Sequence, residues 1–436
     1  MRLFDNYLAG LDGVLSKKTG ASTRFVNQQK KLSESFQNSL QGMPVSNFEG
    51  ENLPEKIEGP KVVFTYDKTN LTKYFGENPD SFETITIGAH PDFKDLGFNS
   101  TLYHHCVSVF VDIKGSTRLI EKYSLEEVRM MKDSLLTLAI HVANQFGGHV
   151  HRLQGDGIFL QFVRRNKNPN DAIVNALNAT SILTQFVSVD LSNMLAQYEI
   201  KPIKIRTGID FGSDEKVLWA HYGIPNCKEL TTTSLHTDMA AKLQGKAYDN
   251  SILIGGNVKE ALDLKQEFWE HFENQVSKEK VFNISTRFSY PFFVFNWKEF
   301  LLSLPFIGKS SNGTDLEIKE RNYSIECYIS DHDGSHIERY YPNSRSIPKE
   351  KKITYKLMRG NSSFLKQSFE RIEWYAYNSG EQAKNKNQLR HDFGKEYINK
   401  NYCQTNAAYL GHHYVECKII NEHSPNEKIT FPIFVQ

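Results

Sequence analysis

Two aspartates, Asp112 and Asp156, are placed so that they could bind metal ions together. Asp112 ends the run CVSVFVD, whose apolar and β-branched residues are typical of a buried strand, and Asp156 lies at the predicted tip of a hairpin formed by residues 149–153 and 158–163. If these strands are neighbours, the two carboxylates lie side by side, and without a cation their repulsion would keep one of them protonated. Two divalent cations remove that conflict, and two metals about 3.5–4 Å apart are what an in-line phosphoryl displacement needs. The pattern therefore predicts a two-metal site for phosphoryl transfer.

The residues that follow Asp112 could complete this site. Oxygen ligands suit hard cations, so we expect Mn²⁺ or Mg²⁺, with the carbonyl oxygen of Ile113 as a further ligand. The backbone amides of Gly115, Ser116 and Thr117 open a predicted helix and would face the phosphates. Ordinary helix capping is the alternative role for Ser116 and Thr117.

The elements that must position these residues alternate between strands and helices. Ser124 and Glu127 form a capping box, behind which apolar residues recur at three- and four-residue steps until Gly147 ends the helix. The predicted order β-α-β-β-α-β is the ferredoxin-like arrangement of an α+β domain. Its elements are expected at residues 106–112, 124–147, 149–153, 158–163, 171–195 and 203–209, followed by a strand at 216–221, a helix at 234–244 and a strand at 251–254.

Composition excludes several classes of protein. Lys and Arg total 52 against 51 Asp and Glu, so the chain lacks the basic excess that is typical of nucleic-acid binding. The five cysteines are scattered without metal-like spacing, which fits a reducing compartment. No uninterrupted apolar stretch reaches the ~18–20 residues of a membrane span, and the start MRLFDNYLAGLDG lacks the apolar run of a secretory signal. We therefore expect a cytoplasmic protein with no nucleic-acid partner and no membrane insertion.

The chain is long enough for two or three domains. Residues 1–100 are expected to form an N-terminal extension, for which the sequence suggests no chemistry. Residues 101–307 contain the predicted α+β unit, and the small polar residues at 308–316 indicate a linker. Residues 317–436 contain three strand-like runs, YSIECYISD, HYVECKII and KITFPIFVQ, so we expect a separate β-rich domain there.

Four runs, FVDIKGST, RLQGDGIFLQF, IRTGIDFG and TDMAAKLQ, resemble in this order the motif series of class III adenylate and guanylate cyclases. The resemblance covers less than half of the chain. It implies that Asp112, Ile113 and Asp156 bind two divalent cations, and that Phe110 and the Gly115–Thr117 turn contact the substrate. It also implies a homodimer with its active sites at the interface, each taking metal ligands from one protomer and the remaining site residues from the other.

The residues expected to recognise the base differ from those of purine cyclases. The position four residues before the second metal aspartate, Lys or Glu in adenylate or guanylate cyclases, is Arg152 here, and the second base-recognition position falls on Thr231. Arg152 can only donate hydrogen bonds, whereas Thr231 can donate or accept. Donors suit the acceptor-rich edges of cytosine and uracil and do not match the 6-amino group of adenine. An ordinary surface charge is the alternative role for Arg152.

The same alignment places Asp238 and Lys242 at the positions that stabilise the transition state in the family, where Asn and Arg are usual. Lys242 keeps the positive charge but lacks the guanidinium fork. An ionised Asp238 cannot donate a hydrogen bond, which leaves open a catalytically inactive protein that only binds a nucleotide or a partner.

These departures resemble the pyrimidine cyclases of bacterial Pycsar antiphage systems, and residues 317–436 resemble the AGS-C sensor domain fused to some of them. The resemblance implies a cytidylate cyclase that converts CTP to 3′,5′-cyclic CMP and pyrophosphate, which a separate effector detects. It also implies a phage-derived activator at the C-terminal domain. CTP is preferred over UTP because of the similarity to sensor-fused members, so a uridylate cyclase stays open, as does a purine cyclase.

Overall fold

Strand β2 (Cys106–Ile113) lies at the centre of an eight-stranded sheet and pairs antiparallel with β4 on one side and β5 on the other. This arrangement is seen in a computed structural model of the chain. The structure describes residues 3–18, 66–273, 278–279, 281–285, 288–313, 315–360, 362–364, 366–367, 370–423 and 425–436. The main path of the sheet is β12-β13-β8-β5-β2-β4-β3, in which β5 and β8 run parallel, and the eighth strand, β9 (Trp269–Glu270), pairs with β13 off this path. The other strands of that path are β3 (Gly148–Gln154), β4 (Gly157–Phe162), β5 (Ile205–Gly212), β8 (Ser251–Gly255), β12 (Val281–Ser285) and β13 (Phe288–Phe295).

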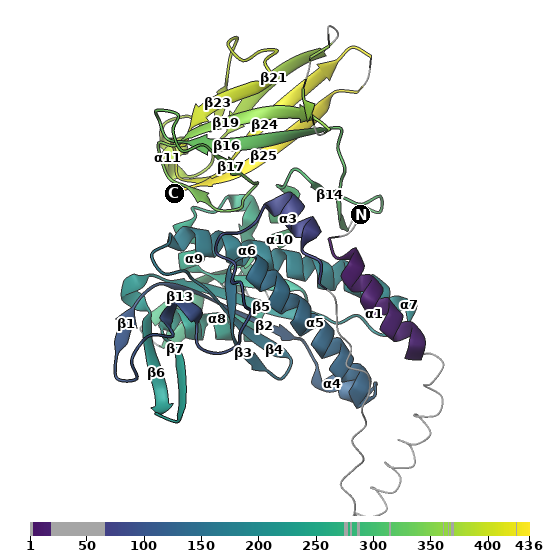
Figure 1. Ribbon diagram of the computed structural model, residues 1–436, viewed down its shortest axis with the longest axis vertical. Helices are drawn as coiled ribbons and strands as arrows, with labels where there is room; N and C mark the ends of the chain where they lie inside the picture. Colours follow the sequence, from purple (N-terminus) through teal and green to yellow (C-terminus); the bar gives the residue numbers. More distant parts are fainter. Residues whose placement is uncertain are drawn as a thin grey trace, which may run out of the picture.

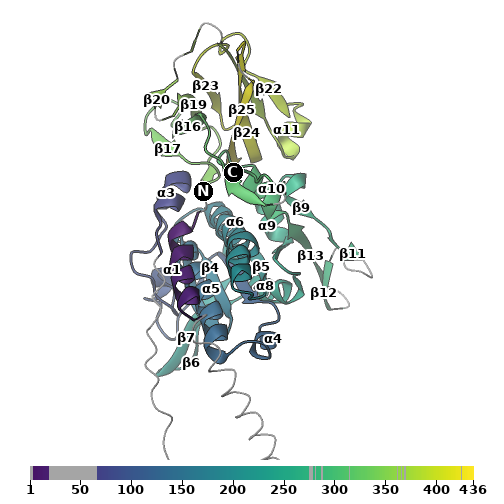
Figure 2. The same ribbon diagram turned by 90° about the vertical axis from the view of Figure 1, so that its right-hand side faces the viewer.

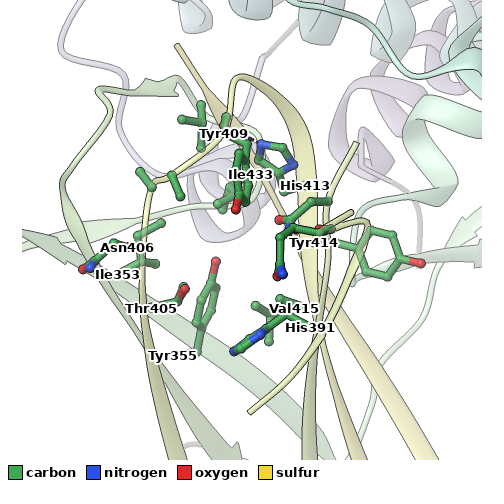
Figure 3. A pocket seen from close by; sticks show the side chains of 16 residues that line it. Ile353, Tyr355, His391, Thr405, Asn406, Tyr409, His413, Tyr414, Val415 and Ile433 are labelled. Atoms are coloured by element: carbon green, nitrogen blue, oxygen red, sulfur yellow. Dashed lines mark hydrogen bonds between the residues drawn. The ribbon is translucent and has the colours of Figure 1, made fainter. Parts of the chain in front are cut away.

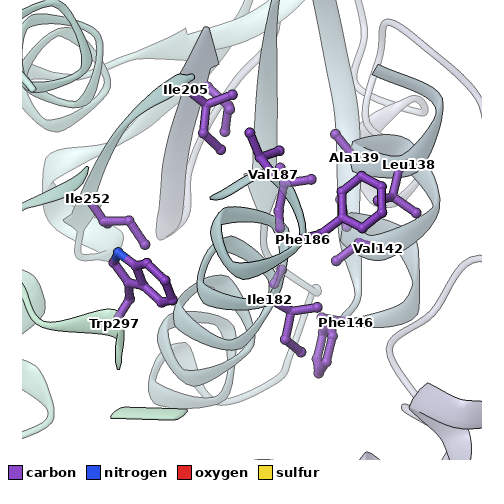
Figure 4. Packing of buried hydrophobic residues seen from close by; sticks show 14 of the residues in the cluster. Leu138, Ala139, Val142, Phe146, Ile182, Phe186, Val187, Ile205, Ile252 and Trp297 are labelled. Atoms are coloured by element: carbon purple, nitrogen blue, oxygen red, sulfur yellow. The ribbon is translucent and has the colours of Figure 1, made fainter. Parts of the chain in front are cut away.

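The predicted ferredoxin-like unit is confirmed. Its four strands lie side by side in the order β5-β2-β4-β3, and the helices α5 (Leu125–Gln145) and α6 (Pro169–Gln185) connect them. Ser124 and Glu127 form the predicted capping box at the start of α5. Apolar residues of α5 and α6 interdigitate over one face of the sheet, where Phe146 and Ile182 are seen in close packing (Figure 4).

The opposite face of β2 is covered by helix α8 (Leu235–Lys246). Strand residues alternate between the two faces, so Val109 and Val111 point into the α5–α6 core while Ser108 lies under α8 and bonds to Thr237 at 3.0 Å between their hydroxyl oxygens. Because Phe110 and Asp112 share the face of Ser108, they lie on the α8 side of the sheet.

The N-terminal residues that the structure describes are part of the core of the α+β domain rather than a separate extension. Helix α1 (Asp5–Lys18) packs against the end of α6. The buried rings of Tyr7 and of Phe4, which directly precedes α1, both meet Phe186, the residue after α6, edge-on. Helix α3 (Thr69–Phe75) adds Phe75 to the same core. Figure 2 shows α1 alongside α5 and α6. Residues 19–65 lie outside the described part of the chain.

A separate three-stranded sheet, β1-β6-β7, projects beside the central one. The sequence predicted one strand at residues 216–221, whereas the chain makes a 3₁₀ turn at Asp214–Lys216 and then a hairpin. Its tip exposes Tyr222 and Ile224, which are 49% and 65% exposed. The strands are β1 (Thr101–Tyr103), β6 (Leu218–Ile224) and β7 (Cys227–Thr233).

The C-terminal residues form a sandwich of two sheets stacked above the α+β domain (Figure 1). One sheet has the order β17-β16-β19-β20, with β23 paired to β19, and the other has the order β18-β25-β24-β21-β22. The three strands predicted from sequence are confirmed as β16, β24 and β25. The bounds are β16 (Tyr323–Ser330), β17 (Glu338–Tyr340), β18 (Ser346–Ile347), β19 (Lys352–Arg359), β20 (Ser362–Ser363), β21 (Glu370–Tyr377), β22 (Arg390–Asp392), β23 (Tyr402–Asn406), β24 (Gly411–Asn421) and β25 (Glu427–Val435).

Residues 308–316, predicted as a linker, instead belong to a β-hairpin of β14 (Ile307–Lys309) and β15 (Leu316–Ile318). The polar residues form its turn, while Ile307, Leu316 and Ile318 pack into the core of the α+β domain, so the hairpin is held by apolar residues on both sides of the small polar run. The α+β domain and the sandwich are in direct contact. The side-chain amide of Asn178 in α6 donates to the carbonyl oxygen of Asn343 at 2.7 Å.

One helical segment, Pro169–Gln197, is long and apolar enough to cross a membrane by length and composition, but 89% of its most apolar window is buried inside the protein. A core helix passes the same test, and the contacts of α6 with the sheet are those of a core helix.

Candidate active site

The structure places Asp112 and Asp156 side by side. Asp112 in β2 is paired with Gly157, the first residue of β4. Asp156 directly precedes β4, so it lies at the same end of these two paired strands as Asp112. Both carboxylates are partly buried, with side chains 23% and 18% exposed. Burial raises the pKa of Asp112, and the neighbouring charge of Asp156 raises it further, against the lowering effect of Arg206. Two carboxylates that repel each other at an accessible strand end are the donor set that divalent cations stabilise.

Two cations from the chain itself compensate these charges. The guanidinium of Arg206 in β5 donates to the Asp112 Oδ2 atom at 2.5 Å, and the Gln244 amide in α8 donates to the same oxygen at 3.2 Å. The ammonium of Lys132 in α5 lies 3.8 Å from the Asp156 Oδ1 atom. Sequence reasoning missed these residues, although the pairing of Arg206 with Asp112 follows from the register of β5 against β2. A metal at this site has to share or replace the Arg206 contact.

The residues after Asp112 are arranged as a turn. The Ile113 side chain is buried in the core, and its carbonyl group belongs to the same end of β2 as the Asp112 carboxylate. Gly115 has a φ of +72°, which allows the chain to turn into the short helix α4 (Thr117–Ile120). The Ser116 side chain makes no capping hydrogen bond, so the capping role for Ser116 is wrong. Gly115 and Thr117 are exposed, which leaves this turn accessible next to the carboxylates.

A second group of residues lies between the end of β3 and strand β7. The Arg152 guanidinium makes a bidentate pair with Glu229, with a distance of 2.9 Å between Nε and Oε1. Thr231 follows two positions later on β7 and therefore shares the face of Glu229. The imidazole Nε2 atom of buried His151 also lies 3.2 Å from the Glu229 Oε1 atom. The structure thus places Arg152 against the face of β7 that carries Thr231. The contact is made through Glu229, an acceptor that sequence reasoning missed.

Phe110 lies between these two groups on the sheet. Its ring stacks on Phe159 with centroids 4.2 Å apart and planes 6° from parallel. The ring is half-buried and shares a face of β2 with Asp112, two residues later. Phe110 therefore forms part of the wall next to the carboxylates.

Asp238 and Lys242 are exposed on the outer side of α8, one turn apart. The Lys242 ammonium lies 5.9 Å from the ring centroid of Phe282. Among the described residues, no contact of Asp238 or Lys242 reaches Asp112 or Asp156. The structure therefore does not bring Asp238 and Lys242 to the carboxylate pair of Asp112 and Asp156 within one chain.

Helix α8 is held against the sheet by a buried polar cluster that the sequence did not reveal. The Asp210 carboxylate in β5 accepts from His236 Nδ1 at 3.0 Å and from the Tyr290 hydroxyl at 2.9 Å. Burial raises the pKa of Asp210, against the lowering effect of His236. Gly208 lets the backbone of α8 approach β5 closely, since a Cβ atom there would lie 2.1 Å from the Ala240 carbonyl oxygen.

A cluster of His104, His105 and Asp214 also has ligand atoms close enough to share a metal ion. It lies before the start of β2, at the opposite end of the strand from Asp112. The backbone amide and the Nδ1 atom of His105 both bond to the Asp214 carboxylate, at 2.8 and 2.9 Å. These bonds explain the cluster as a turn between β1 and β2, separate from the Asp112 and Asp156 pair.

Known proteins share both parts of this architecture. Residues 296–430 match the Adenylyl/Guanylyl and SMODS C-terminal sensor domain family, a match that begins before the predicted boundary at residue 317. A cytidylate cyclase of Staphylococcus aureus is 34% identical over 374 residues, which covers 84% of this chain and 86% of that protein. The chain belongs to the cytidylate cyclase family. Family membership makes it a nucleotide cyclase with a C-terminal sensor domain, as the resemblance implied.

Further members of the cytidylate cyclase family and related proteins match shorter parts. A cytidylate cyclase of Escherichia coli is 38% identical over 205 residues, covering 46% of this chain and 44% of its own. A uridylate cyclase of Gulbenkiania mobilis is 24% identical over 163 residues, covering 36% of this chain and 62% of its own. Among solved structures, the adenylyl cyclase CyaB of P. aeruginosa aligns with a TM-score of 0.39 at 18% identity, over 45% of this chain and 95% of its own.

Proposed function

We propose that this protein converts CTP to 3′,5′-cyclic CMP and pyrophosphate. The observation that carries the proposal is the juxtaposition of Asp112 and Asp156, at the strand end where a nucleotide cyclase needs its metals, in a chain that is 34% identical to a cytidylate cyclase. The ribose 3′-hydroxyl attacks the α-phosphorus, the bond from that phosphorus to the β-phosphate oxygen breaks, and the hydroxyl proton leaves to solvent.

Asp112, Asp156 and the Ile113 carbonyl would hold two divalent cations, Mn²⁺ or Mg²⁺, which lower the pKa of the attacking hydroxyl and neutralise charge on the leaving phosphate. The Gly115–Thr117 turn is accessible next to this pair and would bind the triphosphate through its amides. Lys242 supplies positive charge for the transition state, next to Asp238 on the same helix face.

Arg152, Glu229 and Thr231 form the proposed base-recognition group. Two of the five N–H groups of Arg152 are used by Glu229, so the pair still offers donors beside an acceptor. Cytosine has the matching acceptor N3 and donor 4-amino group, and uracil has O4 and N3–H, so the pair accommodates either pyrimidine. Adenine has the same pattern at N1 and its 6-amino group once Glu229 supplies an acceptor, so the preference for CTP follows from the family. A uridylate cyclase is the second candidate, supported by the similarity to the enzyme of Gulbenkiania mobilis.

We propose a homodimer with two equivalent active sites at its interface. Asp238 and Lys242 are exposed and have no contact with the carboxylate pair of their own chain, so a second protomer is needed to complete each site. The β6–β7 hairpin exposes Tyr222 and Ile224 next to the strand that carries Thr231, which supplies apolar area for such an interface.

In the cell, the proposal places the protein in the cytoplasm as part of antiphage defence. The C-terminal sensor domain would respond to a phage-derived cue, and cyclic CMP would activate a separate effector. The sensor-domain match and membership of the family support these roles.

Incubating the purified protein with each of the four nucleoside triphosphates and Mn²⁺, followed by chromatography of the products, tests the proposal. Cyclic CMP is the expected main product, and Asp112→Ala and Asp156→Ala should abolish it without changing the circular dichroism spectrum. Asp95→Ala, which removes an exposed carboxylate that pairs with Arg165, is the matched control. Cyclic UMP as the main product would favour the second candidate, cyclic AMP or cyclic GMP would refute base recognition as proposed, and no Asp112-dependent product would indicate an inactive protein.

A further inference from the structure

A cavity of about 250 Å³ lies between the two sheets of the C-terminal sandwich. One wall comes from β19 and β23, with Ile353, Tyr355 and Thr405, and the other comes from β21, β24 and β25, with Val415 and Ile433 (Figure 3). Sheets that face each other pack about 10 Å apart, so a cavity between them is a slot that favours a flat occupant. Ligand sites commonly measure about 300–1,000 Å³, so this one suits a small molecule of one or two rings.

The Tyr355 hydroxyl gives the cavity an unsatisfied polar group. Tyr355 is 0% exposed, and its hydroxyl oxygen has no hydrogen-bond partner among the described residues. Figure 3 shows this hydroxyl pointing toward the space that the drawn side chains surround. A buried hydroxyl without a partner is unfavourable, because it has lost its hydrogen bonds to water without replacing them. A ligand with a hydrogen-bonding edge would satisfy it.

The rest of the polar lining is already arranged. The imidazole of His413 accepts from the backbone N–H of Ser379 at 3.0 Å through Nδ1, and Nε2 donates to the Tyr409 carbonyl oxygen at 2.7 Å. Burial lowers the pKa of His413 to about 4, so this wall is neutral at physiological pH. The amide of Asn378 is oriented by a 2.7 Å bond to the carbonyl oxygen of Gln388.

None of the described residues that line the cavity is Lys, Arg, Asp or Glu. Phosphate groups are bound by cationic side chains or by several backbone N–H groups, which give charge-assisted hydrogen bonds. A lining of hydroxyl, amide and imidazole groups with aliphatic walls matches instead an uncharged heterocycle. The exposed His391 and Asn406 lie among the lining residues and open the slot to solvent.

We propose that this cavity binds an uncharged nucleobase or nucleoside, and not a nucleotide, through the Tyr355 hydroxyl. The site is separate from the proposed active site, and its binding is measured without turnover, so it can fail while the cyclase activity stands. It gives the sensor domain a ligand class that its family match does not specify.

Two strands that line the cavity, β24 and β25, also contact the catalytic part of the chain. His412 precedes His413 on β24 and points to the other side, where its ring meets Phe268 and Phe434 with centroids 4.7 and 4.8 Å apart. On β25, Ile433 lines the cavity, and the next residue, Phe434, lies on the opposite face of the strand. Phe434 is buried in the catalytic core. Ligand contacts with β24 and β25 therefore act on strands that also hold the catalytic part.

Isothermal titration calorimetry of the full-length protein with cytidine, uridine, adenosine and guanosine, and with their 5′-monophosphates, tests the proposal. We expect at least one nucleoside to bind and its monophosphate to bind at least about tenfold more weakly, because the cavity lacks a cation. Tyr355→Phe should weaken nucleoside binding by about tenfold through the loss of one buried hydrogen bond. Ala376→Leu, which fills the cavity from β21, should abolish it.

The matched control is Tyr328→Phe, which removes a phenol oxygen from the same domain outside the cavity, where it donates to Glu326 at 2.8 Å. Nucleoside binding that survives both Tyr355→Phe and Ala376→Leu belongs to the active site and overturns the proposal. Binding of monophosphates as tight as that of nucleosides, or binding of no nucleoside, overturns it as well. Thermal unfolding of each variant without ligand shows whether loss of binding reflects a misfolded sandwich.

Discussion

Replacing Gly208 by alanine tests whether the position of α8 controls turnover. A Cβ atom on Gly208 would lie 2.1 Å from the Ala240 carbonyl oxygen and 2.3 Å from the Gln244 backbone nitrogen. Both are backbone atoms of α8, so no side-chain rotation can relieve the overlap. Ordinary van der Waals contacts begin at 3.4 Å, so the helix has to move away from β5 by more than about 1 Å.

That displacement acts on the proposed active site in two ways. The α8 helix carries Asp238 and Lys242, and its Gln244 amide bonds to the Asp112 carboxylate. A misplacement of about 1 Å can reduce turnover by about 100-fold, equivalent to about 2.7 kcal/mol in the activation free energy. Overpacking of a close contact is expected to lower the free energy of unfolding by about 1–3 kcal/mol in addition.

The assay is the rate of cyclic CMP formation from CTP with Mn²⁺, expressed as kcat/KM, with Mn²⁺ affinity measured separately by calorimetry. Gly208→Ala should lower kcat/KM by about 100-fold. Mn²⁺ binding should be largely retained, because Asp112 lies at the end of β2 and Asp156 at the start of β4, not on α8. Gly245→Ala in the same helix, where a Cβ atom meets nothing within 4 Å, is the control and should stay near wild type. A folded Gly208→Ala protein with wild-type kcat/KM would refute the reasoning.

Three further outcomes are expected. Glu229→Gln should reduce kcat/KM for CTP by about tenfold or more, since a charge-assisted hydrogen bond is lost. If the variant keeps the wild-type preference among the four nucleoside triphosphates, Glu229 does not take part in base recognition. Because burial and Asp156 raise the pKa of Asp112 against the effect of Arg206, the folded metal-free protein holds that proton more tightly than the unfolded chain. Mn²⁺ affinity, measured by calorimetry, should therefore be complete above the raised pKa and fall as the pH drops through it. An affinity that stays constant as the pH drops would contradict the raised pKa. Phe434→Ala should lower the free energy of unfolding, measured by urea denaturation, by about 3–5 kcal/mol, because the Phe434 side chain is only 1% exposed at the contact between the domains. A decrease below about 1 kcal/mol would contradict that burial.

Local patterns were sufficient for the catalytic unit. The capping box of Ser124 and Glu127 and the hairpin that carries Asp156 depend on residues a few positions apart, so their structures follow from short-range rules. The alternation in β2 likewise predicts which residues face the core. These elements place Asp112 at a strand end and Asp156 at a hairpin tip, and the antiparallel pairing of β2 with β4 brings the two together.

Long-range pairings were not predictable in the same way. Glu229 meets Arg152, and Arg206 meets Asp112, only through the register of strands far apart in the sequence. The apolar residues of α1 fit any amphipathic helix, and nothing local indicates that they complete the core against Phe186. The polar run at 308–316 has the composition of a linker, and only the burial of Leu316 and its neighbours makes it a hairpin turn.

The sequence by itself therefore determined the α+β order, the two aspartates and the family-level chemistry that they imply, because each depends on residue types and on short-range spacing. The tertiary structure alone decided which charges surround those aspartates, that Glu229 adds an acceptor beside Arg152, and that Tyr355 faces a neutral slot in the sensor domain. Contacts of this kind arise when strands pack in one register out of several that satisfy the same pattern, and the choice depends on the packing free energy of the whole core.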